Sequence, residues 1–180
     1  MLKPSIDFKK GCIMAEENLA PYELGAKDLN RPWGTWEVIE KPIKDSNVVK
    51  QCEKRIVVYP HKMLSLQMHE GREEIWRVEE GTLTVCLNDQ IIELQKGEEI
   101  HIPFHAIHAM VNLTGQNVSV YERQTGNCRE EDNLRLMDDS GRPTVTIDHP
   151  HLNAAKQNYA NLMQRIAPKA LSHRQKAFSK

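Results

Sequence analysis

The sequence predicts an all-β domain followed by one C-terminal helix. Three observations support this fold class: short runs of alternating or β-branched residues recur along the middle of the chain, turn-forming residues separate these runs, and one stretch near the C-terminus has helical spacing. Many short strands at this pitch are typical of a sandwich or a closed barrel, because closure removes exposed sheet edges. The predicted strands are residues 55–59, 63–69, 75–78, 82–87, 91–94, 100–103 and 118–123.

The chain of 180 residues divides into three predicted parts, and its length suits one domain with a hydrophobic core. Residues 1–30 show no sustained period and are expected to form an irregular N-terminal arm. Residues 31–142 form the predicted barrel, and residues 143–180 the C-terminal helix with a basic tail. After Asp148 the chain has no acidic residue but six lysines and arginines.

The C-terminal helix is predicted from apolar residues at helical spacing: Leu152, Ala155, Tyr159, Leu162, Met163 and Ile166. Pro168 follows, where we expect the helix to end, because proline lacks the N–H that a helix interior needs. The apolar stripe is expected to pack on the barrel or on a second subunit.

The composition favours no macromolecular partner. The chain is 39% hydrophobic and 27% charged with a net charge of −1, so neither nucleic acid nor a membrane surface is the expected partner. No apolar run approaches the roughly 20 residues of a membrane span. The apolar stretch after Lys10 is too short for a signal peptide, which predicts a cytoplasmic protein. The four cysteines form no CxxC pair and are expected to be reduced thiols.

Residues 64–69 carry the first sign of a site. On a strand, Leu64, Leu66 and Met68 are expected on one face and Ser65, Gln67 and His69 on the other. In a narrow barrel such a polar row can line the interior, where a metal ion or a ligand binds.

Two further residues complete a possible set of metal ligands. Glu74 follows His69 across a short turn, and His108 comes from a distant strand. Two imidazoles, one carboxylate and the amide oxygen of Gln67 make a mixed nitrogen and oxygen site for one divalent metal ion. Zinc is the first expectation, and iron, cobalt, nickel and manganese remain open.

These two stretches resemble the two sequence motifs of the cupin superfamily. The first motif is matched by Gln67 in place of its first histidine, and then by His69, Glu74 and Gly81. The second motif is matched by Gly97, Pro103, His108 and Asn112, with His105 at its inner glycine position. The resemblance implies a double-stranded β-helix, or jelly-roll barrel, that binds a metal ion through Gln67, His69, Glu74 and His108.

Within the cupins, residues 31–142 are most similar to type II mannose-6-phosphate isomerases, a family that also forms the C-terminal half of bifunctional mannose-1-phosphate guanylyltransferases. The similarity is carried by Arg31-Pro-Trp-Gly34 and by Leu64-Ser-Leu-Gln-Met-His69, and it continues to Arg142. It implies a metal-dependent isomerase that interconverts mannose-6-phosphate and fructose-6-phosphate. A homodimer is expected, and guanylyl transfer is not.

The resemblance also assigns roles in such a site. Arg72, Glu122 and Lys54 are the catalytic candidates, with Glu122 as a base facing inward and Arg72 supporting an oxyanion or a proton relay. Lys54 is in addition a candidate for the phosphate. The substrate-binding candidates are Arg135, Arg142, Asn112 and Trp33.

Three departures from the family pattern keep other functions open. His61 and His105 stand where the family has glycine, and Glu73 stands where a small residue is common. The alternatives are a non-catalytic cupin that binds a sugar or sugar phosphate, and another cupin metalloenzyme such as a dioxygenase or an epimerase.

Overall fold

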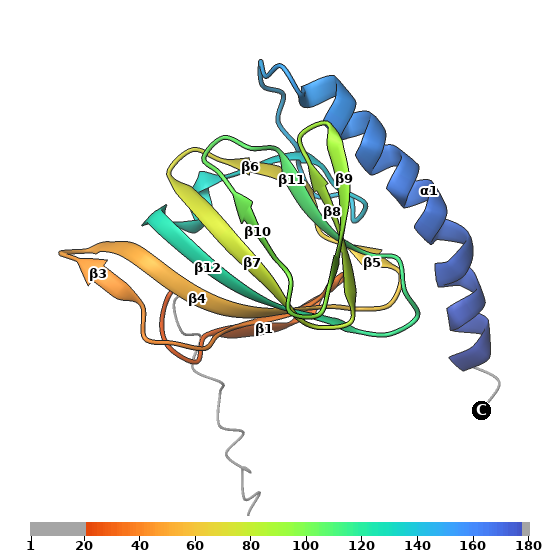
Figure 1. The fold of residues 1–180 in the computed structure, drawn as a ribbon, viewed down its shortest axis with the longest axis horizontal. Coiled ribbons are helices and arrows are strands. Elements are labelled where there is room, and N and C mark those ends of the chain that lie inside the picture. The colour runs from red at the N-terminus through yellow and green to blue at the C-terminus, as the bar shows by residue number, and fades with distance from the viewer. Residues whose placement is uncertain (1–20, 178–180) are drawn as a thin grey trace, which may run out of the picture.

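The computed structural model describes the backbone of residues 21–177, in which two antiparallel sheets pack face to face and one long helix lies beside them (Figure 1). Sheet A has the order β1 (Lys27–Arg31), β2 (Gly34–Val38), β4 (Val48–Val58), β12 (Val118–Cys128), β7 (Arg72–Glu80) and β10 (Glu99–Ile102), with β3 (Ile43–Asp45) paired to β4. Sheet B has the order β13 (Asn133–Met137), β6 (Leu66–His69), β11 (His108–Asn112), β8 (Thr82–Leu87) and β9 (Gln90–Gln95), with β5 (Lys62–Met63) paired to β11. This arrangement confirms the predicted cupin barrel.

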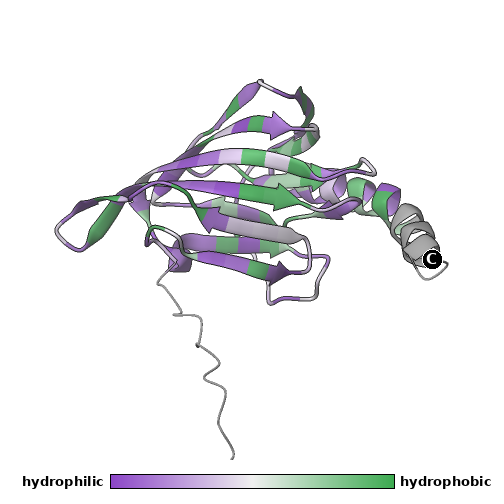
Figure 2. Ribbon diagram, turned by 90° about the horizontal axis from the view of Figure 1, so that it is seen from below, coloured by the Kyte–Doolittle hydropathy of each residue, from purple (hydrophilic) through white to green (hydrophobic). Residues whose placement is uncertain are grey.

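The interior of the barrel is filled by alternate residues of the facing strands. In β4, for example, Ile56 and Val58 are buried while Val57 between them is only half-buried. The interior cluster also includes Trp76 in β7 and Val120 in β12. Figure 2 shows this alternation as hydrophobic and hydrophilic bands along the strands. The apolar cluster fills one part of the barrel, and polar residues line the rest.

A second apolar cluster lies outside the barrel, between sheet B and the helix α1 (Leu152–Ala177). Leu66 and Met68 of β6 point into it, opposite to Gln67 and His69, as the alternation predicts. The helix contributes Ala155, Tyr159, Leu162 and Ile166 to this cluster. The amphipathic helix therefore packs on its own barrel.

The strand predicted at residues 63–69 is broken in the middle. Strand β5 ends at Met63 and β6 begins at Leu66, and Leu64 packs against the interior cluster instead of the helix side. The hydroxyl of Tyr159 donates a hydrogen bond of 2.9 Å to the Leu64 carbonyl. The helix thus supplies a partner for a backbone group at this break.

Two predicted boundaries are wrong. Strand β1 begins at Lys27, so the barrel starts inside the segment predicted as an irregular arm; residues 1–20 lie outside the described residues. Antiparallel pairing with β2 stabilises β1, although most of its side chains are exposed and hydrophobic residues do not alternate with polar ones along its sequence. The helix continues through Pro168 to Ala177. Proline removes one backbone hydrogen bond of the helix, but the residues on both sides of it have high helix propensity.

The histidines at two family glycine positions keep the backbone conformation of glycine. His61 has φ = 54° and His105 has φ = 62°, both in the left-handed region that glycine adopts most readily. These two departures therefore add a side chain without changing the direction of the turn.

Three cysteines, Cys52, Cys86 and Cys128, are free and buried, as predicted; Cys12 lies outside the described residues. Burial raises the pKa of Cys86 to about 11. Among the described residues, no helix is long and apolar enough to cross a membrane.

We expect Leu162→Ala to lower the free energy of unfolding by about 2–5 kcal/mol, because the side chain is fully buried between α1 and sheet B. Gln164→Ala on the exposed side of the same helix should change it by less than about 0.5 kcal/mol. Urea denaturation of both variants measures the difference. Equal stability of the two variants would contradict the packing described here.

Candidate metal centre and pocket

Three buried side chains from three strands converge inside the barrel. His69 lies at the end of β6, Glu74 lies in β7 after the connecting turn, and His108 begins β11, which pairs with β6. One ring nitrogen of each histidine and one carboxylate oxygen of Glu74 all lie within 4.8 Å of one another. The side chains are at most 2% exposed. The predicted residues His69, Glu74 and His108 are therefore brought together as one possible metal-binding cluster.

Gln67 lies next to this cluster. It is the direct cross-strand partner of His108, and it lines the adjoining pocket. Its Oε1 accepts a hydrogen bond of 3.2 Å from the Ser65 hydroxyl. The position beside His108 is compatible with a fourth ligand, which stays a prediction.

The hydrogen bonding of His108 prepares one of its nitrogens for a metal ion. Its Nδ1 lies 2.9 Å from the Ala106 carbonyl oxygen, which can only accept, so Nδ1 carries the proton. The other nitrogen, Nε2, is buried and has no hydrogen-bond partner among the described residues. Burial lowers the pKa of His108 to about 4, which keeps the ring neutral. A buried lone pair with a fixed tautomer fits a metal ligand.

Glu74 is held by a dense set of donors. Arg72 Nε donates to Oε1 over 3.0 Å, and Trp76 Nε1 donates to Oε2 over 2.9 Å. Burial alone would raise the pKa of Glu74, but His69 and Arg72 hold it well below its usual value. The carboxylate is therefore charged, as a metal ligand must be.

Arg72 connects the cluster to the loop that follows β12. Its Nη2 lies 3.0 Å from His69 Nε2, and its Nη1 donates to the Arg129 carbonyl over 2.9 Å. An ion bound at His69 Nε2 would replace the contact between this nitrogen and Arg72, which would release that part of the guanidinium group. The donor set and the orphaned Nε2 of His108 fit one divalent ion.

A second carboxylate lies close to the first. Glu122 in β12 faces inward as predicted and is 5% exposed. The amide nitrogen of Gln124 donates to Glu122 Oε2 over 2.9 Å and to Glu74 Oε1 over 3.3 Å, so it bridges the two acids. Burial, with the charge of Glu74 nearby, raises the pKa of Glu122 to about 8. Lys54 is the cross-strand partner of Glu122 and lines the same pocket.

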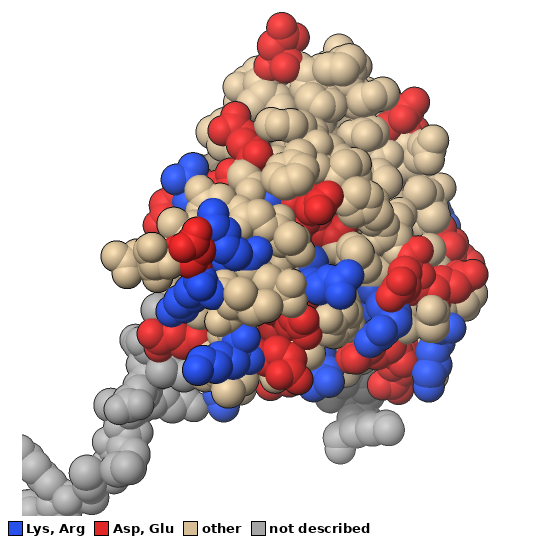
Figure 3. Space-filling view, turned by 60° about the vertical axis from the view of Figure 1, so that its left-hand side comes forward, with Lys and Arg blue, Asp and Glu red and all other residues tan. Residues whose placement is uncertain are grey.

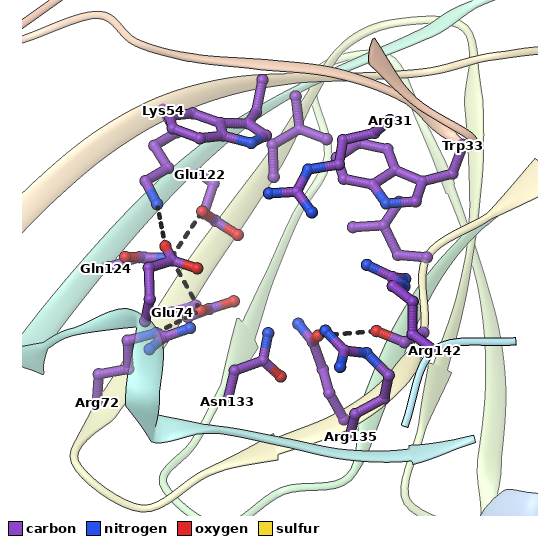
Figure 4. A pocket seen from close by; sticks show the side chains of 16 residues that line it. Arg31, Trp33, Lys54, Arg72, Glu74, Glu122, Gln124, Asn133, Arg135 and Arg142 are labelled. Carbon is purple, nitrogen blue, oxygen red and sulfur yellow. Dashed lines mark hydrogen bonds and ion pairs between the residues drawn. The ribbon is translucent and has the colours of Figure 1, made fainter. Parts of the chain in front are cut away.

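Three arginines lie across the pocket from these acids (Figure 4). Arg31 is the last residue of β1, Arg135 lies in β13, and Arg142 lies in the segment after β13. All three line the pocket. Arg142 is anchored to Asp138 by two hydrogen bonds of 2.6 and 3.1 Å. Burial, together with the charges of Arg142 and Arg31, lowers the pKa of Arg135. Cations held close together against their mutual repulsion form a site for an anion.

The remaining predicted residues differ in position. Trp33 lines the pocket, but Asn112 does not: it is fully buried, donates to the carbonyl oxygens of Val58 and Gln116, and so ties loops together. Glu73 points away from the pocket, where its carboxylate lies 2.8 Å from His101 on the outer face of sheet A. The departure at Glu73 thus adds no acid to the pocket.

Eight residues that line the pocket were not among the predicted site residues: Arg31, Trp36, Ile56, Leu64, Ser65, Gln124, Glu130 and Asn133. Arg31 stands in the same Arg-Pro-Trp-Gly segment that supplied Trp33, so that motif could have identified it. Gly34 in this motif lets β2 approach β4, since a Cβ there would lie 1.8 Å from the Val57 oxygen. The motif therefore brings Arg31 and Trp33 to the pocket edge.

The surface around this end of the barrel carries both signs of charge. In Figure 3, lysine and arginine side chains are mixed with aspartate and glutamate in the lower part of the face shown, while most of the upper part is uncharged. Neither sign dominates on this face, in contrast to the cluster of three arginines within the pocket.

Comparison with known proteins identifies the family of this chain. The sequence model of the family described as mannose-6-phosphate isomerase C-terminal matches residues 23–139. The mannose-1-phosphate guanylyltransferase ManC of Salmonella typhimurium is 36% identical over 117 residues, which are 64% of this chain and 23% of that protein. The corresponding enzyme of Klebsiella pneumoniae is 31% identical over 140 residues, covering 77% and 28%. The alginate biosynthesis protein AlgA of Pseudomonas aeruginosa is 30% identical over 112 residues, covering 62% and 22%.

The fold and the converging histidines and glutamate define a cupin with a candidate metal site. Because the family model covers well over half of its length, the chain belongs to the mannose-6-phosphate isomerase C-terminal family. It spans about a quarter of the length of the curated relatives it matches.

We expect the purified protein to bind about one zinc ion per chain and His108→Ala to lose this binding, because the variant removes the unpartnered Nε2. His101→Ala, which removes an exposed histidine on the outer face of sheet A, should bind zinc as the wild type does. Metal analysis after dialysis measures the stoichiometry. Unchanged zinc content in His108→Ala would place the metal elsewhere.

Proposed function

We propose that this chain is a metal-dependent aldose–ketose isomerase that acts on a sugar phosphate, with mannose-6-phosphate and fructose-6-phosphate as the pair. One observation carries the proposal: the pocket is lined on one side by Glu74 of the candidate metal cluster and by the buried acid Glu122, and on the other side by three arginines. An isomerase of this kind needs a base at the carbonyl end of its substrate and cations at the phosphate end. Membership of the isomerase C-terminal family supports this substrate class.

In this proposal the substrate phosphate binds to Arg31, Arg135 and Arg142. Guanidinium groups present paired N–H donors that match phosphate oxygens. The anchoring of Arg142 by Asp138 fixes one of these groups before the substrate arrives. The sugar chain then extends past Trp33, which lies on the arginine side of the pocket, towards Glu122 on the opposite side.

The proton transfer is assigned to Glu122. Its carboxylate takes the proton from C2 of the aldose, the electrons of that bond form a C1–C2 double bond, and the C1 carbonyl oxygen becomes an enediolate oxygen. Transfer of the hydroxyl proton from O2 to the enediolate oxygen O1, and return of the proton from Glu122 to C1, give the ketose. Lys54 beside Glu122, and Arg72 once released from His69, stabilise the negative charge on the enediolate.

The predicted metal ligands are Gln67, His69, Glu74 and His108. A divalent ion held there would supply Lewis-acid stabilisation of the substrate oxygens. Zinc remains the first proposal for the identity of the ion. The imidazole, carboxylate and amide ligands also suit iron, cobalt, nickel and manganese, so these four metals stay open.

We expect metal-loaded protein to convert mannose-6-phosphate to fructose-6-phosphate and chelator to abolish the turnover. Glu122→Gln should lower kcat by at least about 100-fold, since it removes the proposed base but keeps the side-chain shape. A coupled assay for fructose-6-phosphate measures both. Absence of turnover with every one of the five metals, in protein that binds metal stoichiometrically, would reject this isomerase and favour a cupin that only binds the sugar.

We expect Arg135→Leu to weaken binding of mannose-6-phosphate by about 10- to 100-fold, because a charge-assisted hydrogen bond to phosphate is lost. Arg77→Leu, on the exposed outer face of sheet A, is the matched control and should bind normally. Calorimetric titration measures the affinity. A normal affinity in Arg135→Leu would exclude this arginine as a phosphate ligand.

A further inference from the structure

Lys54 is an unusual cation because it is almost completely buried in the barrel. Its side chain is 5% exposed, and it lies in the interior row of β4 with Cys52 and Ile56. A lysine ammonium on a flexible four-carbon stem normally stays in water, and burial without partners is costly. The surroundings of Lys54 must therefore stabilise the charge and fix its position.

Two aromatic rings and one carboxylate surround the ammonium group. Its Nζ lies 4.4 Å from the centre of the Tyr22 ring and 5.0 Å from the centre of the Trp36 ring. The Nζ also lies 3.5 Å from Oε1 of Glu130, a half-exposed residue in the short 3-10 helix η1 (Glu130–Asp132) that follows β12. Both rings are within the distance at which an aromatic face attracts a cation.

Tyr22 belongs to the segment before β1 and lies one residue outside the part of the chain that the family model matches. Its ring is 8% exposed and packs with Ala26, Val38, Val49 and Cys128. A turn in front of β1 fixes this segment, with Gly25 N–H donating to the Val38 carbonyl over 3.0 Å and Val38 N–H donating to the Ala26 carbonyl over 2.8 Å. The position of the ring is thus determined by packing.

The hydroxyl of Tyr22 is buried and has no hydrogen-bond partner in the part of the chain that the structure describes. Within residues 21–177 the hydroxyl thus contributes no hydrogen bond, while the ring of Tyr22 lies under the ammonium group of Lys54. The contact with Lys54 is made by the aromatic ring of Tyr22 and not by its hydroxyl, so phenylalanine could make the same contact.

From these contacts we propose that Tyr22 is a positioning residue: with Trp36 it forms an aromatic clamp that holds the Lys54 ammonium in the pocket beside Glu122. The proposal rests on the proposed isomerase function, in which Lys54 stabilises the enediolate. Without the Tyr22 ring, the flexible stem of Lys54 loses one of the contacts that fix its ammonium group in the pocket. Tyr22 therefore acts on the reaction through Lys54 and does not contact the substrate.

The first test measures the clamp without any assay of activity. In protein labelled with ¹³C-lysine, the Lys54 side-chain signals, assigned with Lys54→Met, are expected at positions shifted by the two ring currents. Tyr22→Phe should keep this shift, and Tyr22→Leu should move the signals towards those of an ordinary lysine. An unmoved Lys54 signal in Tyr22→Leu would overturn the clamp. Because this measurement needs no substrate, a failure of the isomerase proposal does not affect it.

The second test measures the consequence for the reaction with a double-mutant cycle. Tyr22→Leu should lower kcat/KM for mannose-6-phosphate by about tenfold, and Tyr22→Phe should restore most of it. In the Lys54→Met background, Tyr22→Leu should cause no further loss, because the residue it positions is gone. Full additivity of the two changes, or equal loss in Tyr22→Phe and Tyr22→Leu, would overturn the proposal.

A matched control separates the clamp from a general effect of losing an aromatic ring that contacts a cation. Tyr121 on the outer face of sheet A forms a similar pair with Arg77, whose guanidinium carbon lies 4.7 Å from the ring centre. Tyr121→Leu should leave kcat/KM and the Lys54 signals unchanged. Thermal denaturation of all variants confirms that each is folded at the assay temperature.

Discussion

The arrangement of the site depends on one buried charge, the carboxylate of Glu74. A carboxylate that is 2% exposed is strongly destabilised unless its oxygens are fully partnered. Arg72, Trp76 and Gln124 supply these partners from β7 and β12, and His69 lies 3.2 Å away on β6. Satisfying this single group therefore fixes the relative positions of three strands and orients two other candidate functional residues, Arg72 and His69.

Much of this design follows from local sequence rules. The two-residue period of β strands correctly separates Gln67 and His69 from Leu66 and Met68, and it places Glu122 inside. The motif resemblance brings His69, Glu74 and His108 together although 34 residues separate the last two. Where period and motif agree, the sequence alone defines both the fold and the core of the site.

Other features depend on contacts that no local pattern contains. Tyr22 lies in a segment without a period, and its role arises from packing against Lys54. Leu64 breaks the alternation because β5 and β6 are separate strands, and the bond from Tyr159 to its carbonyl crosses 95 residues of sequence. Pro168 does not end the helix, since its backbone cost is smaller than the stabilisation of the surrounding helix. These cases require knowledge of tertiary neighbours.

Strand β6 connects the site with the helix in a way that has a thermodynamic consequence. One face of this short strand carries Gln67 to the pocket and His69 to the candidate metal cluster, and the other carries Leu66 and Met68 against α1. Docking of the helix and binding of an ion at His69 thus constrain the same four residues. Linkage requires the effect to be reciprocal: an ion that stabilises β6 tightens the helix on sheet B, and a helix that packs firmly raises affinity for the ion. The C-terminal helix, remote from the pocket, is in this sense coupled to the candidate metal site.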